Sequence, residues 1–343
     1  MSLTWSKAIR IITRPLRTSS DSIRFPLRFK ATVTVQYYVK TTIPYFCPMA
    51  GFIKDPKIAV YDGKGFNLSD YNTSYRGGIE NKKKGRAKLE ADKLLLHHYQ
   101  RMMYALDNHG VLLVFQAMDA AGKDSTIRHV FSGMFPQGGQ VFSFKAPSHR
   151  ELDHDYLWRT SLCLPERGRL SIFNRSYYEE VLVTRVHPQY ILGQRIPGID
   201  SLDRIDNKFW EKRFRAIRDH ELHLAENGTI ILKFFLNVSL DKQKNRFMDR
   251  IDRQEKNWKF NFGDLKERAL WPQYQYAYEE AIKNTAADHA PWFIIPADCK
   301  WYMRSVVCDI VVEKLKELGL KYPQLSAEET AKLSKARSIL EEE

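Results

Sequence analysis

The sequence predicts an α/β fold in which a parallel β-sheet is sandwiched between two layers of helices. Five continuous apolar runs of strand length, the kind that a parallel sheet buries on both faces, occur at 111–117, 140–144, 169–173, 229–236 and 292–297. Helix-like segments separate these runs, as in successive βαβ units. With 343 residues, 43% of them hydrophobic and 28% charged, the chain is long enough to bury a substantial core.

Residues 1–50 form a basic extension rich in Ser and Thr. Eight Lys or Arg residues oppose the single acid Asp21, so this segment carries more than half of the net charge of +13. The composition is typical of an organellar transit peptide, but a flexible extension and a start site at Met49 remain open alternatives. The milder basic excess of residues 51–343 favours a polyanionic partner without requiring a nucleic-acid-binding face.

Neither a membrane span nor a disulfide framework is expected. The most lipid-like stretch, residues 31–39, is too short to cross a bilayer and ends at Lys40. The cysteines do not form CxxC pairs, which favours a reducing compartment, and we expect the cytoplasm unless residues 1–50 direct import. They are Cys47, Cys163, Cys299 and Cys308.

Helical patterns surround the predicted strands. In residues 79–110 apolar side chains recur at helical spacing until Asn108 and Gly110 stop the pattern. A charged region with scattered aromatic residues, 239–284, is predicted to be a helical subdomain between the last two strands, and 326–343 a charged helical tail. The periodic residues of the first helix are Leu89, Leu95, Leu96, Tyr99, Met102, Met103 and Leu106.

The stretch VLLVFQAMDAAGKDST, residues 111–126, has the order of a phosphate-binding P-loop. A strand leads into a turn with Gly122 and Lys123, and a helix begins there, so that backbone N–H groups and the lysine meet an anion. Two residues depart from the usual pattern: Ala117 replaces the first Gly, and Asp124 stands where Ser or Thr normally holds the metal.

A carboxylate inside this turn helps to decide between two interpretations, a phosphate site and an ordinary turn with a solvated lysine. Asp119 would repel phosphate unless it carries Mg²⁺ or orients a group there. We therefore favour a phosphate site with Asp119 as the metal ligand. The residues expected to contact phosphate here are Ala121, Gly122, Asp124, Ser125, Thr126 and Arg128.

Two further segments bring cations to this end of the sheet. The run at 169–173 is followed by Asn174 and Arg175, where a Walker B strand would end in Asp. Arg175 could neutralise the negative charge on a phosphoryl group while it is transferred. The alternative is a plain turn with a surface charge. Residues 239–284 carry a basic stripe that is either a solvated face or a lid over phosphates. Its members are Lys242, Arg246, Arg250 and Arg253.

The motifs together resemble those of a family-2 polyphosphate kinase over about residues 58–325. They are MDAAGKDSTIRHVFSGMFPQG, VFSFKAPS, DYLWR, IFNRSYYEEVLVTRVHP, GTIILKFFLNVS, KNWKFNFGDLKER and APWFIIPADCKWYMR. The resemblance implies a P-loop kinase domain over 51–325, similar to thymidylate kinase, with a helical lid at about 239–284. It implies reversible, Mg²⁺-dependent transfer of phosphoryl groups between inorganic polyphosphate and nucleotides, with Mn²⁺ as an alternative metal.

The resemblance also assigns residues. Asp119 and Lys123 carry over as Walker A functional residues, Arg175 as the Walker B arginine, and Asn174 stands where many members have Asp. The NRS spelling at 174–176 resembles the branch that accepts nucleoside monophosphates as well as diphosphates. A homo-oligomer without nucleic-acid or membrane partners is expected. Further phosphate contacts are expected from Arg185, Arg246 and Arg250, and nucleotide contacts from Lys145, Pro147 and Ser148.

Two rival functions remain. An ATP-dependent nucleotide kinase on the same fold would need a pocket for the donor adenine, of which the sequence carries no mark. A non-catalytic protein that binds polyanions would leave Asp119 unexplained, and it predicts binding without turnover and with a steep dependence on salt.

Overall fold

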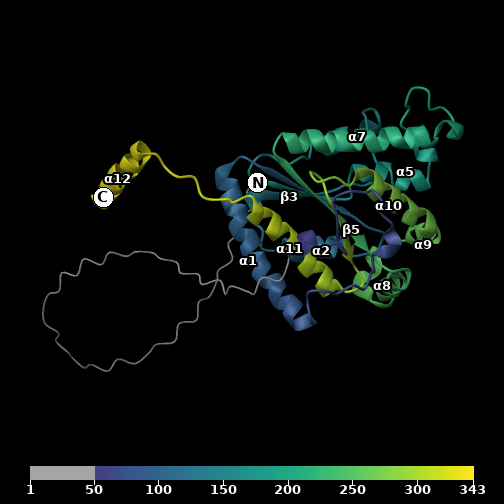
Figure 1. The fold of residues 1–343 in the computed structure, drawn as a ribbon, viewed down its shortest axis with the longest axis horizontal. Helices are drawn as coiled ribbons and strands as arrows, with labels where there is room; N and C mark the ends of the chain where they lie inside the picture. Colours follow the sequence, from purple (N-terminus) through teal and green to yellow (C-terminus); the bar gives the residue numbers. More distant parts are fainter. Residues whose placement is uncertain (1–50) are drawn as a thin grey trace, which may run out of the picture. The chain divides into compact units, whose positions relative to one another are not determined.

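The computed structural model describes residues 51–343, and Figure 1 draws them in colour. The predictions for residues 1–50, including Cys47, lie outside the described residues. The other three cysteines, Cys163, Cys299 and Cys308, are free thiols.

A six-stranded sheet forms the centre of the fold, in the order β1-β6-β5-β2-β4-β3. Five strands are parallel, and β1 pairs with β6 in the antiparallel direction. The parallel strands are the five apolar runs of the sequence, each displaced by no more than one residue at either end. The two-residue β1 is too short to show an alternating pattern and was not predicted. The strands are β1 Ala59–Val60, β2 Gly110–Gln116, β3 Gly139–Ser143, β4 Leu170–Asn174, β5 Thr229–Asn237 and β6 Trp292–Pro296.

Helices connect the strands and cover the sheet (Figure 1). The α-helices are α1 Lys82–Leu106, α2 Lys123–Val130, α3 His149–Leu152, α4 Trp158–Ser161, α5 Val183–Val186, α6 Gln189–Leu192, α7 Asn207–Glu226, α8 Leu240–Asp252, α9 Phe262–Ala269, α10 Trp271–Thr285, α11 Lys300–Glu317 and α12 Ala327–Glu341. The 3-10 segments are η1 Phe52–Lys54, η2 Leu68–Asp70, η3 Pro136–Gly138, η4 Tyr177–Glu180, η5 Leu202–Arg204 and η6 Gln254–Lys259.

Local signals set the ends of the predicted first helix, α1. The Asn81 side chain caps its beginning by accepting a hydrogen bond from the Lys84 backbone N–H, which has no partner within the helix. The helix ends at Leu106 because Asp107 takes a left-handed conformation with φ of 49°. The stop therefore comes slightly before Asn108 and Gly110, where the sequence pattern placed it.

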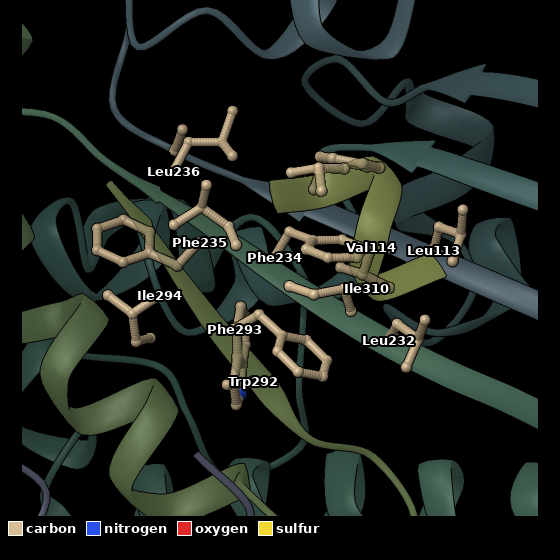
Figure 2. Close-up of a cluster of buried hydrophobic side chains, with 14 of the residues drawn as sticks. Leu113, Val114, Leu232, Phe234, Phe235, Leu236, Trp292, Phe293, Ile294 and Ile310 are labelled. Carbon is tan, nitrogen blue, oxygen red and sulfur yellow. The ribbon is translucent and has the colours of Figure 1, made fainter. Parts of the chain in front are cut away.

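Alternating side chains of β5 show that the sheet is covered on both faces. Phe234 stacks on Phe115 of β2, which in turn contacts Phe131 at the end of α2. Phe235 points the other way and stacks on Tyr278 of α10, with ring centroids 4.2 Å apart. Figure 2 shows Phe234 and Phe235 within a cluster of buried apolar side chains from β2, β5, β6 and α11. The fold is therefore a three-layer α/β sandwich, as predicted, with a mostly parallel sheet.

The region predicted as a lid divides into two parts. Helix α10 buries one face, including Tyr274, Tyr278 and Ile282, against the core, so it is part of the sandwich. Helix α8, the segment η6 and helix α9 precede it. In the tail α12 has no buried residue. No helix among residues 51–343 combines the length and the apolar character that a bilayer span needs.

Candidate active site

The phosphate loop joins β2 to α2. Gly122 has a φ of 104°, a left-handed conformation that a side chain would strain, and Lys123 is the first residue of the helix. The N–H groups of the first helical turn have no acceptor within α2, so they face the space in front of the loop. The predicted strand, turn and helix are therefore present in the order that an anion site needs.

Lys123 is folded back over its own loop. Its Nζ donates to the carbonyl oxygen of Ala117 at 2.7 Å, and the residue is only 9% exposed. Burial lowers the pKa of Lys123, Arg175 lowers it further, and the carboxylates of Asp119 and Glu179 act in the opposite direction. The lysine is a desolvated cation, whose charge acts strongly on an anion entering the loop.

Helix α8 backs the loop. Gln243 donates to the carbonyl oxygen of Asp119 at 2.9 Å. Arg246 Nη1 donates to the carbonyl oxygens of Ala120 at 3.0 Å and Ala121 at 2.5 Å, and Nη2 donates to that of Ala297. The loop carbonyls therefore turn toward α8, and Arg246 is a buried support for the loop.

The second constellation stands at the end of β4. Arg175 has a φ of 65°, unusual for a residue with a side chain, while its N–H extends the ladder to the carbonyl oxygen of Phe115 at 3.1 Å. Its guanidinium lies between two carboxylates, 3.1 Å from Asp119 and 3.7 Å from Glu179. These two acids raise the pKa of Arg175, Glu179 most strongly, and the arginine is a fixed cation at the loop.

Glu179 was not predicted from the sequence. It is largely buried beside Arg175, and burial raises its pKa while Arg175 and Lys123 lower it. Its only sequence signal was its position four residues after the arginine in the IFNRSYYEE motif.

The unusual loop residue Asp124 contacts Asn174, the unusual residue at the end of β4. Asn174 Nδ2 donates to Asp124 Oδ1 at 2.8 Å, and Ser143 Oγ lies 3.4 Å from the same amide nitrogen. In the usual pattern a hydroxyl stands in the loop and a carboxylate ends the neighbouring strand. Here the carboxylate is in the loop and the neutral donor is on the strand, so the contact again joins one acid to one donor.

A basic cleft of about 930 Å³ opens in front of the loop. Three carboxylates line it, those of Asp119, Asp124 and Asp249, against ten cationic side chains. Four of these cations, Lys256 and Lys259 of η6 and Lys300 and Arg304 of α11, were not predicted as site residues. The six that were predicted are Lys123, Arg128, Lys145, Arg175, Arg246 and Arg250.

The basic surface continues beyond the cleft. A second cavity of about 540 Å³ shares Arg246, Lys300 and Arg304 with the cleft and reaches Lys82 and Arg86 of α1. Burial and the neighbouring Arg246 lower the pKa of Lys300, as expected where cations crowd together. This arrangement suits a polyanion longer than one phosphate group.

A different pocket shares Phe144, Lys145, Ala146 and Arg175 with the cleft. It measures about 410 Å³, and Phe144, Pro147, Val183 and Tyr190 supply much of its apolar wall. Lys145 lines both this pocket and the cleft. Charged side chains, those of Lys145, Arg159, Arg175, Glu179 and Glu180, also line this pocket. Apolar walls with a few polar groups are features of a site for a small molecule such as a nucleoside, and Lys145 and Pro147 are two of the three residues predicted for it.

Three predicted contact residues have other roles in the structure. The hydroxyl of the buried Thr126 donates to the carbonyl oxygen of Gly122 and faces Met303, so it points into the core. Ser148 caps α3 and accepts from the Glu151 N–H. Arg185 lies over the rings of Trp210, Phe214 and Tyr276 and lines none of the cavities described above. These contacts do not direct the three side chains toward a phosphate or a nucleotide, and their expected roles in binding stay predictions.

The loop provides ligands that suit Mg²⁺. Among residues 51–343 no three His, Cys, Asp or Glu side chains gather as a metal cage. Mg²⁺ needs no such cage, because it keeps several waters and binds through one or two carboxylates and substrate phosphates. The carboxylates of Asp119 and Asp124 both line the cleft, so the residues present fit this ion.

Comparisons with known proteins agree with this geometry. Residues 79–322 match the family described as Polyphosphate kinase 2 (PPK2). The chain is 45% identical over 288 residues to the ADP-polyphosphate phosphotransferase of Rhodopseudomonas palustris, covering 84% of this chain and 99% of that protein. It is 45% identical over 266 residues to the AMP/ADP-polyphosphate phosphotransferase of Meiothermus ruber, covering 77% and 93%.

A solved structure supports the fold. The crystal structure of polyphosphate kinase 2 from Arthrobacter aurescens superimposes with a TM-score of 0.74 and 36% sequence identity, covering 83% of this chain and 97% of that one. The family match extends over more than half of the chain, and the relatives align over nearly their whole length. The phosphate loop, the turn at residues 174–178 that carries Arg175 (the arginine turn) and these similarities together identify the chain as an enzyme of the polyphosphate kinase 2 family.

Proposed function

We propose that the protein transfers the terminal phosphoryl group of inorganic polyphosphate to nucleoside mono- and diphosphates, converting AMP to ADP and ADP to ATP, reversibly and with Mg²⁺. The names of the Rhodopseudomonas and Meiothermus relatives support the choice of substrates. The cytoplasmic location and the homo-oligomeric state expected above stay predictions.

The difference between the two spaces that Arg175 lines carries this proposal. Cations line the cleft and continue into the second cavity. The pocket has partly apolar walls. A polyphosphate donor needs the first and has no base to bury, whereas a nucleotide acceptor needs the second. An ATP-dependent kinase would need an apolar pocket for each of its two nucleotides.

The reaction needs alignment and charge neutralisation more than proton transfer. An oxygen of the acceptor's terminal phosphate attacks the terminal phosphorus of the donor, and the P–O–P bond of the donor breaks. The donor leaves one phosphate shorter. The acceptor phosphate is already anionic at neutral pH, so no general base is required. The obstacle is the approach of two polyanions.

Residues around the loop are placed to reduce that repulsion. Lys123 and the N–H groups of α2 would hold the donor's terminal phosphates, and Arg175 would neutralise charge on the transferring group. Arg175 would keep one carboxylate partner if Asp119 held a metal, because Glu179 lies beside its other nitrogen. A divalent metal belongs to the chemistry of such phosphotransferases, and Mg²⁺ held by Asp119 would supply positive charge that offsets the charge of the phosphates.

A time course from pure AMP tests the proposal. The protein is incubated with long-chain polyphosphate, Mg²⁺ and AMP, without ATP, and ADP should appear first and ATP after it. If ADP never forms while added ADP is converted to ATP, the monophosphate activity is wrong and the diphosphate activity stands. Turnover only with ATP as donor would support the nucleotide-kinase alternative. Salt-sensitive binding without turnover would support the non-catalytic one.

A further inference from the structure

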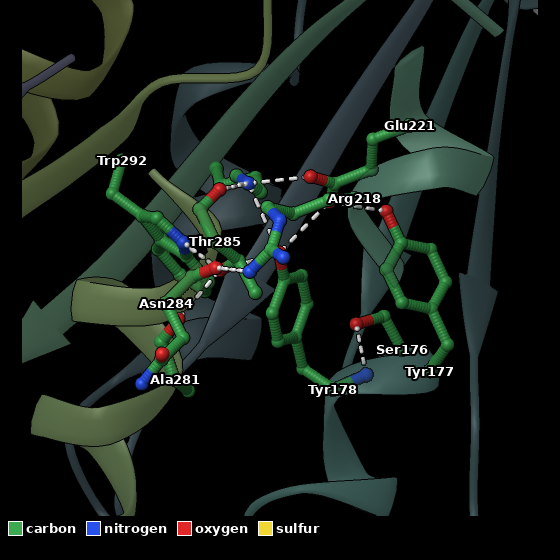
Figure 3. A network of polar contacts seen from close by, with 10 residues as sticks. Ser176, Tyr177, Tyr178, Arg218, Glu221, Ala281, Asn284, Thr285 and Trp292 are labelled. Atoms are coloured by element: carbon green, nitrogen blue, oxygen red, sulfur yellow. Dashed lines mark hydrogen bonds and ion pairs between the residues drawn. The ribbon is translucent and has the colours of Figure 1, made fainter. Parts of the chain in front are cut away.

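A fully buried polar network lies directly behind the arginine turn. Lys233 of β5 and Glu221 of α7 form an ion pair with an Nζ–Oε2 distance of 2.6 Å, and neither side chain has exposed surface. Tyr177 and Tyr178 follow Arg175 closely in η4, and their hydroxyl oxygens lie 2.8 and 2.9 Å from Glu221 Oε1. Figure 3 shows both rings pointing from the turn toward this carboxylate.

Every hydrogen of the lysine ammonium has an acceptor. Besides Glu221, Lys233 Nζ donates to Tyr178 Oη at 2.9 Å and to the carbonyl oxygen of Thr285 at 2.8 Å. Thr285 Oγ1 in turn accepts from Trp292 Nε1 at 2.9 Å. The network therefore ties the arginine turn to β5, β6, α7 and α10, and it fixes the two tyrosines in one orientation.

Stability alone does not account for this ion pair. Taking two charges wholly out of water costs free energy, and replacing both partners of a buried pair with apolar residues of similar volume is often neutral or stabilising. Lys233 occupies a position that an apolar side chain could fill, as the buried Ile231 and Phe235 do on the same face of β5. What apolar side chains cannot supply is a fixed direction for the two tyrosine hydroxyls.

The segment held by those tyrosines is strained. Arg175 has a φ of 65°, and such a conformation persists in a residue with a side chain only where the surroundings determine it. Its N–H is held by Phe115 on one side. Next along the chain, the buried Ser176 accepts a hydrogen bond from the Tyr178 N–H at 3.1 Å. Gln116 Nε2 also lies 3.0 Å from Ser176 Oγ, and the tyrosine hydroxyls add anchors at Glu221.

We infer that Lys233 and Glu221 are positioning residues, which hold the turn through Tyr177 and Tyr178 so that Arg175 meets the transferring phosphoryl group. They touch neither substrate, and they act through the arginine. The inference rests on the proposed function, because it concerns the step in which Arg175 takes part.

The test removes both charges together. In the double variant Lys233→Met with Glu221→Leu, no charge is left buried without a partner, so we expect a melting temperature within about 5 °C of the wild-type value. We expect kcat to fall at least about tenfold, since the barrier rises when Arg175 is misplaced. The KM for polyphosphate should stay within about twofold, because the cations of the cleft do not touch the network.

The same double replacement is then made in an Arg175→Ala background. If the network acts through the arginine, removing it there should cost less than about a further twofold in kcat, since coupled changes are not additive. A network that only stabilises the fold would lower kcat by the same factor in both backgrounds. That result, or wild-type kcat in the double variant, would overturn the inference.

A milder variant covers the case in which the double replacement does not fold. Tyr178→Phe removes one hydroxyl and keeps the ring, and Tyr104→Phe on the exposed side of α1 is its control. We expect Tyr178→Phe to lower kcat at least about threefold, whereas Tyr104→Phe should leave kcat unchanged. In the Arg175→Ala background, Tyr178→Phe should no longer lower kcat. Equal rates in both tyrosine variants would reject the inference. Wild-type protein that lacks polyphosphate-dependent turnover would instead reject the proposed function.

Discussion

Exchanging Asn174 for Asp tests the contact between the phosphate loop and β4. Asn174 Nδ2 lies 2.8 Å from Asp124 Oδ1, so the new carboxylate would face an existing one at that distance. Two unit charges so placed repel by about 1.5 kcal/mol at the dielectric constant of water and by about 6 kcal/mol at an effective value of 20. Losing a hydrogen bond to a charged acceptor costs about 1.5 to 3 kcal/mol more. Asp124 is exposed, so we expect the lower sum, about 3 kcal/mol of lost stability at neutral pH.

The loss should depend on pH and on metal. Repulsion raises the pKa of one of the two carboxyls in the folded protein, so the penalty is present at neutral pH and disappears as the pH falls and that carboxyl takes up a proton. Mg²⁺ between the carboxylates should relieve it too. The ratio of AMP to ADP phosphorylation should change, while neither activity is abolished, because the site keeps its shape and gains charge.

A compensating exchange provides the control. In the double variant Asn174→Asp with Asp124→Ser, one acid again faces one donor, and we expect the wild-type melting temperature to return. Thermal melts between pH 5 and 8 with and without Mg²⁺, and initial rates with AMP and with ADP, measure both effects. An Asn174→Asp protein with the wild-type melting temperature at pH 8 and the wild-type substrate ratio would refute the reasoning.

Three further predictions concern the loop, the helix α1 and the extension. Lys123→Ala and Asp119→Asn should each lower kcat at least about a hundredfold with unchanged circular dichroism, because both act on transition-state charge; near-normal rates would contradict the site. Burial raises the pKa of Asp92 to about 6. Protonated Asp92 therefore contributes to the free energy of unfolding at low pH, and this contribution is lost as the pH rises through about 6. Asp92→Asn should therefore melt at a higher temperature than wild type at pH 8 and at the same temperature near pH 4, and the reverse order would refute this. Deleting residues 1–48 should leave activity and melting temperature nearly unchanged, and a collapse of either would show that the segment is structural.

The fold could be predicted because its signals are local. Four of the five parallel strands, β2, β4, β5 and β6, are mostly buried, and burial on both faces is what produces a continuous apolar run. The fifth, β3, lies at the edge of the sheet, and its residues are exposed or half-buried. The short β1 has no such signal, because only its pairing with β6 makes it a strand. Helix α10 was assigned to the lid because its charged neighbours in the sequence hid its buried face.

The site could be predicted only in part, because many of its contacts join distant segments. Lys123 and Arg175 lie within recognisable motifs, whereas Lys300 and Arg304 reach the cleft only because β6 ends beside the loop. Arg185 lies within a matching motif, but three aromatic rings from α7 and α10 hold its guanidinium away from the cleft. Sequence position gives the residue type, and tertiary packing gives the direction of the side chain.

The support that Arg246 gives to the loop limits how the predicted lid could open. Helix α8 cannot swing away as a rigid body without taking the donors from the carbonyl oxygens of Ala120, Ala121 and Ala297. A lid that opened beyond Arg246, in the segment that carries Lys256 and Lys259, would keep these contacts. The loop would then stay assembled between turnovers, so that a polymeric donor could remain bound while one acceptor is exchanged for the next.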